Sequence, residues 1–217
     1  MKTITVKGVG SAASKPDLVL LSIALRSINM DYERSMKEAA DKVSELNESL
    51  IPLGFEKEAI KTTDFHVDTE YESKKDRYGN YYREFQGYAV THDLKLSFDF
   101  DTKLLSRVLT AIALCASQPE ISVRFTIKDP SAVRKLMLEN AAKNAREKAE
   151  ILCKASGVEL GEIVTIDYNW GEVNVFSSTR YSALEECALG CSVGINMDIE
   201  PDEINASDTV TFVWQIK

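Results

Sequence analysis

The sequence predicts an α+β fold in which long antiparallel strands, two of them paired as a ribbon, carry two major amphipathic helices. Apolar and polar residues alternate over 60–73 and again over 81–100, which is typical of strands that bury one face. Residues 31–53 instead carry apolar side chains at helical spacing. Strands and helices follow no regular βα order, so the pattern favours α+β over a parallel α/β sheet.

The N-terminal part of the chain is predicted to form two strands and a helix. Residues 3–13 alternate, and residues 17–28 are apolar at both parities, as in a strand covered on both faces. We expect these two strands to pair as a hairpin around Lys15-Pro16. The helix over 31–53 ends at Gly54, a natural C-cap. Its apolar stripe, which we expect to pack on a sheet, consists of Tyr32, Met36, Ala39, Val43, Leu46 and Leu50.

Residues 60–73 and 81–100 are predicted to pair as a long two-stranded ribbon. A charged segment, 74–80, joins the two strands and forms the hairpin tip. We expect the ribbon to bury one face along its length. On the second strand this face carries Tyr88, Val90, His92, Leu94, Leu96 and Phe98.

Two further helices and a strand are predicted in the next part. Asp101 is placed to cap a helix, and residues 121–128 follow as a strand. Asp129-Pro130 opens the longest helix, which runs to about Ser156 and is closed by Gly157. The small side chains on one side of this helix allow a close approach to a sheet or another helix. They belong to a stripe of Val133, Met137, Ala141, Ala145 and Ala149.

Residues 160–217 are predicted to form two strands separated by an irregular segment. Residues 160–168 and 209–217 have strand patterns, and in the latter Val210, Phe212 and Trp214 share one face. Residues 169–191 have no clear period and are predicted to be the least regular part of the chain.

Composition limits the function classes. The chain has 217 residues, of which 44% are apolar and 28% charged, with a net charge of −8. This is globular usage, and an acidic chain argues against general binding to nucleic acid. No run approaches the ~20 apolar residues of a membrane helix, so no membrane insertion is expected. Without a signal-peptide pattern at the start, the sequence as written is expected to be cytoplasmic.

The residues that most often carry chemistry form no convincing constellation, so we assign no catalytic, cofactor-binding or metal-binding residue. Gly8-Val9-Gly10 is only a GxG inside a strand, which fails the context of a dinucleotide site. A hydrolase would need His66 or His92, and neither has a recognisable nucleophile. Cys187 and Cys191 form a CxxxC pair that is most simply two reduced thiols. The sequence therefore predicts a protein that is not an enzyme.

The aromatic residues of the ribbon are more suggestive. A protruding hairpin rich in tyrosine and charge suits a protein–protein interface. The alternative is a ribbon that packs on its own domain. The candidate interface residues are Tyr71, Tyr78, Tyr81, Tyr82 and Phe85.

Several short motifs follow one another over nearly the whole chain. They are Ile4-Thr5-Val6-Lys7-Gly8-Val9-Gly10 with Lys15-Pro16-Asp17, Leu53-Gly54 with Ile60-Lys61-Thr62-Thr63-Asp64-Phe65, Gly87-Tyr88-Ala89-Val90, Asp129-Pro130 with residues 144–150 and 157–161, and Ile199-Glu200-Pro201-Asp202-Glu203-Ile204. This ordered set resembles the SIMPL-domain family, a domain of unknown function. The family includes many bacterial envelope proteins, often exported to the periplasm, and an animal kinase-associated adaptor.

The resemblance implies an α+β fold, assembly into homo-oligomers that are ring-like in some members, and a link to bacterial stress defence. It implies no established catalytic residues and no cofactor. We therefore expect one domain over 1–217, and if it divides, subdomains 1–100 and 101–217. The expected function is a non-enzymatic, oligomer-forming protein, with other protein partners as a further option.

One alternative function stays open at this point. The irregular segment 169–191 brings a tryptophan, a tyrosine and two cysteines close together in sequence, which suits a small-molecule or metal-binding protein. The residues involved are Trp170, Tyr181, Cys187 and Cys191.

Overall fold

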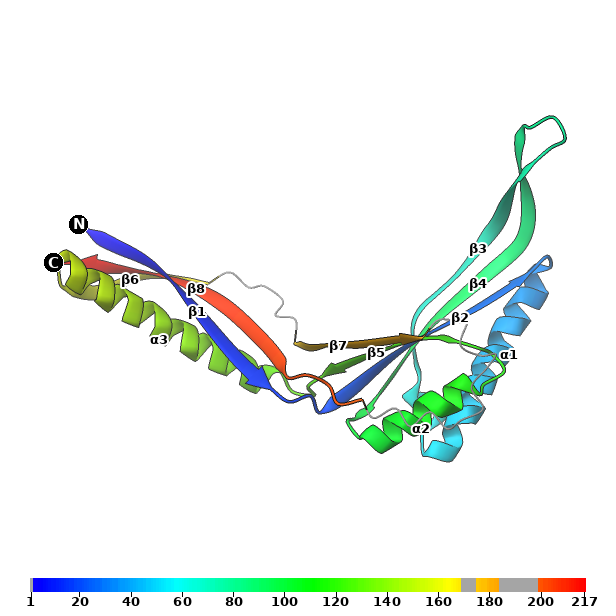
Figure 1. Ribbon diagram of the computed structural model, residues 1–217, viewed down its shortest axis with the longest axis horizontal. Helices are drawn as coiled ribbons and strands as arrows, with labels where there is room; N and C mark the ends of the chain where they lie inside the picture. Colours follow the sequence, from blue (N-terminus) through cyan, green and yellow to red (C-terminus); the bar gives the residue numbers. More distant parts are fainter. Residues whose placement is uncertain (1, 169–174, 184–198) are drawn as a thin grey trace. The chain divides into compact units, whose positions relative to one another are not determined.

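A computed structural model describes residues 2–168, 175–183 and 199–217. The described residues form two antiparallel sheets and three α-helices, which confirms the α+β prediction (Figure 1). It divides into two compact units, each assembled from segments distant in sequence. Unit 1 comprises Met1–Asp17, Thr126–Ser178 and Pro201–Lys217, and unit 2 comprises Leu18–Phe125 and Thr179–Glu200. The sequence-based division at residue 100 stays a prediction.

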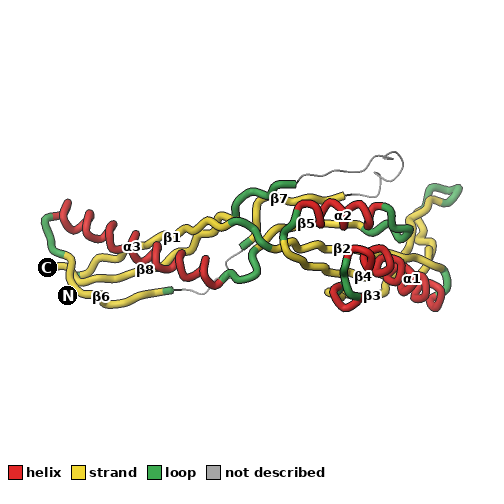
Figure 2. Tube along the Cα trace, turned by 90° about the horizontal axis from the view of Figure 1, so that it is seen from below, coloured by secondary structure: helices red, strands yellow, loops and turns green. Residues whose placement is uncertain are grey.

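Unit 1 contains a three-stranded sheet with one long helix on a single face. The strands are β1 (Thr3–Ser14), β8 (Ile204–Ile216) and β6 (Leu160–Asp167), in the order β1-β8-β6. β1 and β8 pair without a shift over twelve residues. Helix α3 (Ser131–Ser156) lies along this sheet, as Figure 2 shows. The alanines of its predicted stripe are buried in one cluster with Phe212 and Trp214, and Val133 and Met137 in a second cluster with Ile204. Gly157 ends the helix in the left-handed conformation.

The GxG motif explains how closely α3 approaches β1. A Cβ atom at Gly8 would lie 2.0 Å from the Ala141 carbonyl oxygen, and one at Gly10 would lie 1.8 Å from the Met137 oxygen. Ala145, the next small residue of the stripe, is fully buried. Only hydrogen side chains on the strand fit at this distance, so the motif is a packing feature.

Helix α3 also covers the outer edge of β1 with polar side chains. Asn144 Oδ1 accepts a hydrogen bond from the backbone N–H of Val9 at 3.1 Å, and Asn140 Nδ2 donates to the Ser11 carbonyl at 2.9 Å. Lys148 Nζ donates to a third β1 carbonyl at 3.2 Å. These residues recur every four positions, so one side of the helix satisfies backbone groups that an edge strand would leave unpaired.

Unit 2 is built on a five-stranded sheet with the order β3-β4-β2-β5-β7. The strands are β2 (Leu18–Asn29), β3 (Lys61–Lys75), β4 (Tyr81–Asp99), β5 (Glu120–Thr126) and β7 (Phe176–Ala183). Helices α1 (Tyr32–Leu50) and α2 (Thr102–Ala113) pack together with β2, β4 and β5 in one apolar core. Two short 3₁₀ turns, η1 (Ile51–Leu53) and η2 (Lys57–Ala59), lead from α1 into β3.

Local capping signals set where these helices begin. Asp101 accepts hydrogen bonds from the backbone of Lys103 at 2.8 Å and Leu104 at 3.3 Å, which confirms its predicted role as N-cap. Asp31 caps α1 in the same way, through the N–H of Arg34. No helix in the described part of the chain is long and apolar enough to cross a membrane.

Three expectations about the strands are wrong. β1 and β2 form no hairpin, because β1 pairs with β8 and β2 pairs with β4. The connection is held instead at Asp17, whose N–H donates to Thr126 and whose carboxylate accepts from Lys128. β7 lies in the segment expected to be irregular, where a polar run hides the strand pattern. The ribbon is not buried on one face throughout, because β3 is an edge strand and is almost wholly exposed.

Candidate functional site

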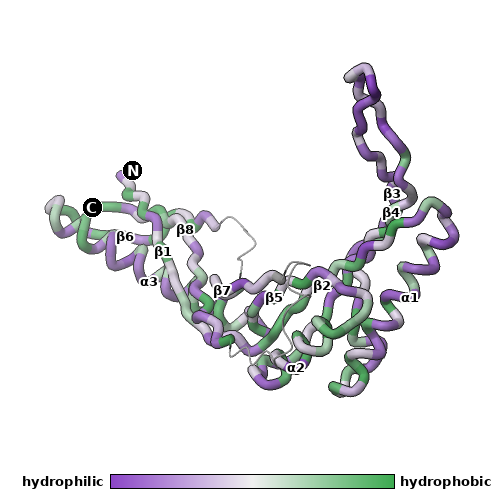
Figure 3. Tube along the Cα trace, turned by 45° about the vertical axis from the view of Figure 1, so that its right-hand side comes forward, coloured by the Kyte–Doolittle hydropathy of each residue, from purple (hydrophilic) through white to green (hydrophobic). Residues whose placement is uncertain are grey.

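The outer part of the β3–β4 ribbon consists of two strands alone. β2 ends with Asn29 opposite Tyr88, so residues 81–87 of β4 pair only with β3 (Figure 1). This part is mostly hydrophilic along the chain (Figure 3), yet it carries exposed aromatic rings. A two-stranded ribbon is marginally stable by itself, so the contacts along it matter.

A row of aromatic rings runs along one face of the ribbon. Tyr71 and Phe85 are direct cross-strand partners with ring centroids 5.5 Å apart. Phe85 meets Tyr88 at 5.4 Å, and Tyr88 meets Tyr32 at the start of α1 at 5.5 Å. All three pairs are edge-to-face, a geometry worth about 0.5–1.5 kcal/mol beyond burial. A register shift between Glu70 and Tyr71 brings Phe85 and Tyr88 to the same face.

Basic side chains lie over the exposed tyrosine rings. The pairs are Arg83 over Tyr71 at 4.7 Å, Lys75 over Tyr81 at 4.8 Å and Arg77 over Tyr78 at 5.2 Å. Such cation–π contacts hold the rings in defined positions while leaving them accessible. These contacts favour particular orientations of the exposed tyrosine rings, and ordered tyrosines of this kind are common in the interaction surfaces of binding proteins.

The opposite face of the outer ribbon is charged. Lys74 forms ion pairs with Glu84 and, at 3.3 Å, with Glu72. The hydrogen bond to Glu84 raises the pKa of Lys74, and the same bond lowers the pKa of Glu84. Tyr82 lies opposite Lys74 in the register and so shares this face. These charges are exposed, and solvent screening keeps their contribution to stability small.

The hairpin tip is a preorganised turn. The Asp76 carboxylate accepts hydrogen bonds from the backbone N–H of Tyr78 at 2.8 Å and of Asn80 at 2.9 Å. The bond from Asn80 is the main reason that the pKa of Asp76 is lowered. Gly79 has φ +86°, which suits glycine. The turn leaves the Tyr78 side chain 77% exposed at the apex.

The structure thus places the five predicted interface residues in three settings. Tyr71, Tyr81 and Phe85 lie on the aromatic face, Tyr82 on the charged face, and Tyr78 at the tip. The row itself extends further than predicted, because the sequence does not show that Tyr32 of α1 meets Tyr88.

The two histidines lie on opposite faces of the ribbon. His66 Nδ1 is 2.9 Å from an Asp64 oxygen, and His66 Nε2 is 3.6 Å from an Asp68 oxygen. His92 Nε2 lies 2.8 Å from the Thr62 hydroxyl, and burial lowers the pKa of His92. Within the described residues no group of three His, Cys, Asp or Glu side chains is arranged to hold a metal ion.

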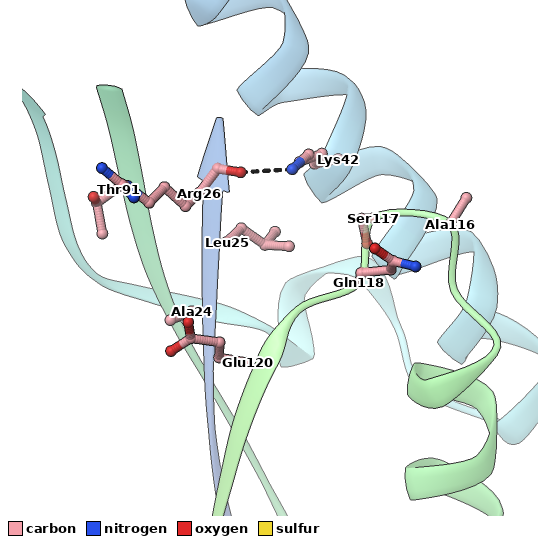
Figure 4. A pocket seen from close by; sticks show the side chains of 9 residues that line it. All are labelled: Ala24, Leu25, Arg26, Lys42, Thr91, Ala116, Ser117, Gln118 and Glu120. Carbon is pink, nitrogen blue, oxygen red and sulfur yellow. Dashed lines mark hydrogen bonds between the residues drawn. The ribbon is translucent and has the colours of Figure 1, made fainter. Parts of the chain in front are cut away.

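Unit 2 also contains a small pocket of 190 Å³ beside the end of β2 (Figure 4). Lys42 donates to the Arg26 carbonyl at 2.5 Å across it, and the Arg26 guanidinium pairs with Glu70. Gln118, on its wall, has φ +44°. The pocket combines residues from five segments, so no local pattern in the sequence could reveal it. Its two basic side chains, Arg26 and Lys42, already interact with other residues of the same chain.

The segment behind the alternative prediction lies mostly outside the described residues, including Trp170, Cys187 and Cys191. Tyr181 is described, and it packs partly buried against the core of unit 2. The other two cysteines, Cys115 and Cys153, are buried free thiols, as expected from their apolar surroundings.

The chain belongs to the SIMPL family, described as a protein of unknown function (DUF541), which matches residues 4–214. It is similar to the uncharacterized protein YggE of Edwardsiella ictaluri (strain 93-146). The two are 24% identical over 214 residues, which cover 98% of this chain and 86% of YggE. The family resemblance seen in the sequence is thereby confirmed.

Proposed function

We propose that this protein is a non-enzymatic assembly protein whose β3–β4 ribbon joins copies of the chain into homo-oligomers. One observation carries the proposal. The outer ribbon presents exposed aromatic rings with basic side chains against them, and no third strand of the described chain pairs with this part of the ribbon. A role of such oligomers in stress defence is an expectation from the family resemblance.

The exposure of the tyrosine rings explains why the ribbon suits association. Tyr78 is 77% exposed and Tyr81 is 69% exposed. Tyrosine side chains that are already ordered lose little conformational entropy on binding, so most of the gain from burying them is kept. Arg77 and Arg83, which lie over two of the tyrosine rings, also match the enrichment of tyrosine and arginine at interface centres.

The test is the absolute mass of the untagged protein, measured by light scattering after size exclusion at several concentrations, with and without reductant. We expect a stable species larger than the monomer. In the double variant Tyr78→Ala/Tyr81→Ala the dissociation constant should rise at least about tenfold.

A matched control is Ile151→Ala. This side chain is also large, apolar and 66% exposed, but it belongs to α3 of unit 1 and not to the ribbon. It should leave the mass unchanged. A monomer at every concentration would overturn the proposal, as would equal effects of the ribbon variant and the control.

A further inference from the structure

The sheet edges differ in how far they are open to another strand. The outer edge of β1 is covered by Asn140, Asn144 and Lys148 of α3. β6 is short, and two register shifts within it interrupt any continuous ladder. At β7, Ser177 and Ser178 donate to Asp202.

The edge of β3 is different, because it is long and regular. From Asp64 to Lys75 the strand contains no extra residue, since the bulge in this stretch places its additional residue in β4. No described element pairs with its outer side. Such an edge is a template for strand addition.

We propose that β3 pairs antiparallel with β3 of a second copy of this chain, with Thr69 on the twofold axis. The inference rests on the proposed function and specifies how two copies meet. Two identical edges present their hydrogen-bonding groups at the same alternate residues, so the twofold axis must pass through a residue position and not between two residues. With the axis at Thr69, residue i lies opposite residue 138 − i of the second copy. Other allowed registers move the axis by whole residues. The charge pattern of β3 selects among these registers.

In this register the two faces of the new pair are complementary. On the face bearing Asp64, that residue lies opposite Lys74 of the second copy, and His66 lies opposite Glu72. On the other face, Val67 lies opposite Tyr71. Each contact occurs twice because of the symmetry, and cross-strand pairs of these types stabilise sheets.

Neighbouring registers are less favourable. A twofold axis at Asp68 would place Asp64 opposite Glu72 and the two Asp68 side chains opposite each other. An axis at Glu70 would place the two Glu70 side chains opposite each other. Like charges directly opposite are destabilising.

The register with Thr69 on the axis has one unfavourable pair, Asp68 opposite Glu70. Glu70 is already ion-paired with Arg26 of its own chain, which offsets the repulsion. Lys74 is likewise ion-paired within its own chain, with Glu72 and Glu84, so Asp64 of the second copy would join an existing charge network. With His66 opposite Glu72 and Val67 opposite Tyr71 as well, the favourable pairs outnumber the unfavourable one.

The experiment is disulfide cross-linking of Thr69→Cys under mild oxidation, with the wild-type chain as the blank for the native thiols. Opposed Cα atoms in an antiparallel pair are about 4.5–5.5 Å apart, within disulfide range. We expect a covalent dimer. Ser73→Cys is the matched control, because Ser73 should lie opposite Phe65 and about 26 Å from its own copy.

Charge reversal tests the register. In the Thr69→Cys background, Asp64→Lys or Lys74→Glu alone should slow cross-linking by about fivefold. The combination Asp64→Lys/Lys74→Glu should restore the rate, because opposite charges again face each other. A double variant as slow as the single ones would overturn the assigned register.

The mass of the same variants separates the two proposals. If they form oligomers but Thr69→Cys gives no more cross-link than wild type, or Ser73→Cys cross-links equally well, then β3 pairing is wrong and the proposed function stands. If the wild-type chain is monomeric at every concentration, the proposed function itself fails.

Discussion

The contact between β1 and α3 predicts a large effect from the smallest possible side chain. In Gly8→Ala the new methyl group would lie 2.0 Å from the Ala141 carbonyl oxygen and 2.7 Å from the Ala145 Cβ. The oxygen belongs to the helix backbone and cannot rotate away. Helix α3 must therefore move from the strand by about 1.4 Å, the difference between 2.0 Å and the 3.4 Å of ordinary contact.

The cost follows from the packing that this movement disrupts. Ala141, Ala145 and Ala149 are fully buried, and their short side chains cannot fill a gap that opens beside them. Overpacking a close contact costs about 1–3 kcal/mol, and loss of the neighbouring contacts adds to it. We expect Gly8→Ala to reduce the free energy of unfolding by about 3 kcal/mol. That is a large part of the ~5–15 kcal/mol typical of a domain.

Urea unfolding followed by tryptophan fluorescence measures this effect. Trp214 is buried in the core of unit 1 and stacks on Phe212, so it reports this packing directly. A Trp170→Phe background removes the other tryptophan. Ser11→Ala, an exposed change on the same strand, should stay within about 0.5 kcal/mol. A loss below 1 kcal/mol in Gly8→Ala would refute the close-packing argument.

Three further outcomes are expected. Burial lowers the pKa of His92 in the folded chain. As pH drops below the ordinary value of 6.5, the unfolded chain takes up a proton on His92 before the folded chain does, so the stability of the protein should fall. His92→Gln should reduce the loss of stability between pH 7.5 and pH 5, measured as the change in urea midpoint. An equal loss of stability between the two pH values in His92→Gln and in the wild type would contradict this. Asp76→Ala should leave global stability nearly unchanged but speed hydrogen exchange of the Tyr78 amide; unchanged exchange would contradict a preorganised tip. Asn144→Ala should cost about 1 kcal/mol in thermal or urea unfolding, because the Val9 amide loses its acceptor; a neutral effect would mean that water replaces it.

Local signals predicted most elements of the fold. The Asp101 cap, the Asp129-Pro130 start and the Gly157 end of α3 all depend on residues within a few positions of the helix terminus, and the structure confirms them. The turn after Lys75 was likewise visible as a charged tip between two alternating runs.

Strand partners were the part that the sequence could not show. β1 pairs with β8, near the other end of the chain, and nothing local distinguishes that partner from the neighbouring β2. β7 was missed because its residues lack the alternation that marks a half-buried strand. The candidate interface residues were recognised by type, but their division between two faces depends on the register of the ribbon and its bulge.

The row of polar side chains on α3 has a consequence for how copies of the protein can assemble. A chain with adhesive strand edges on two sides could add copies without limit and become a fibre. The side chains of Asn140, Asn144 and Lys148 cover one such edge in the folded chain. An antiparallel contact between two β3 strands would occupy the outer β3 edge of both copies at the same time. Strand pairing would then end at two chains, and a larger assembly would have to be built through side-chain faces, which favours finite particles over filaments.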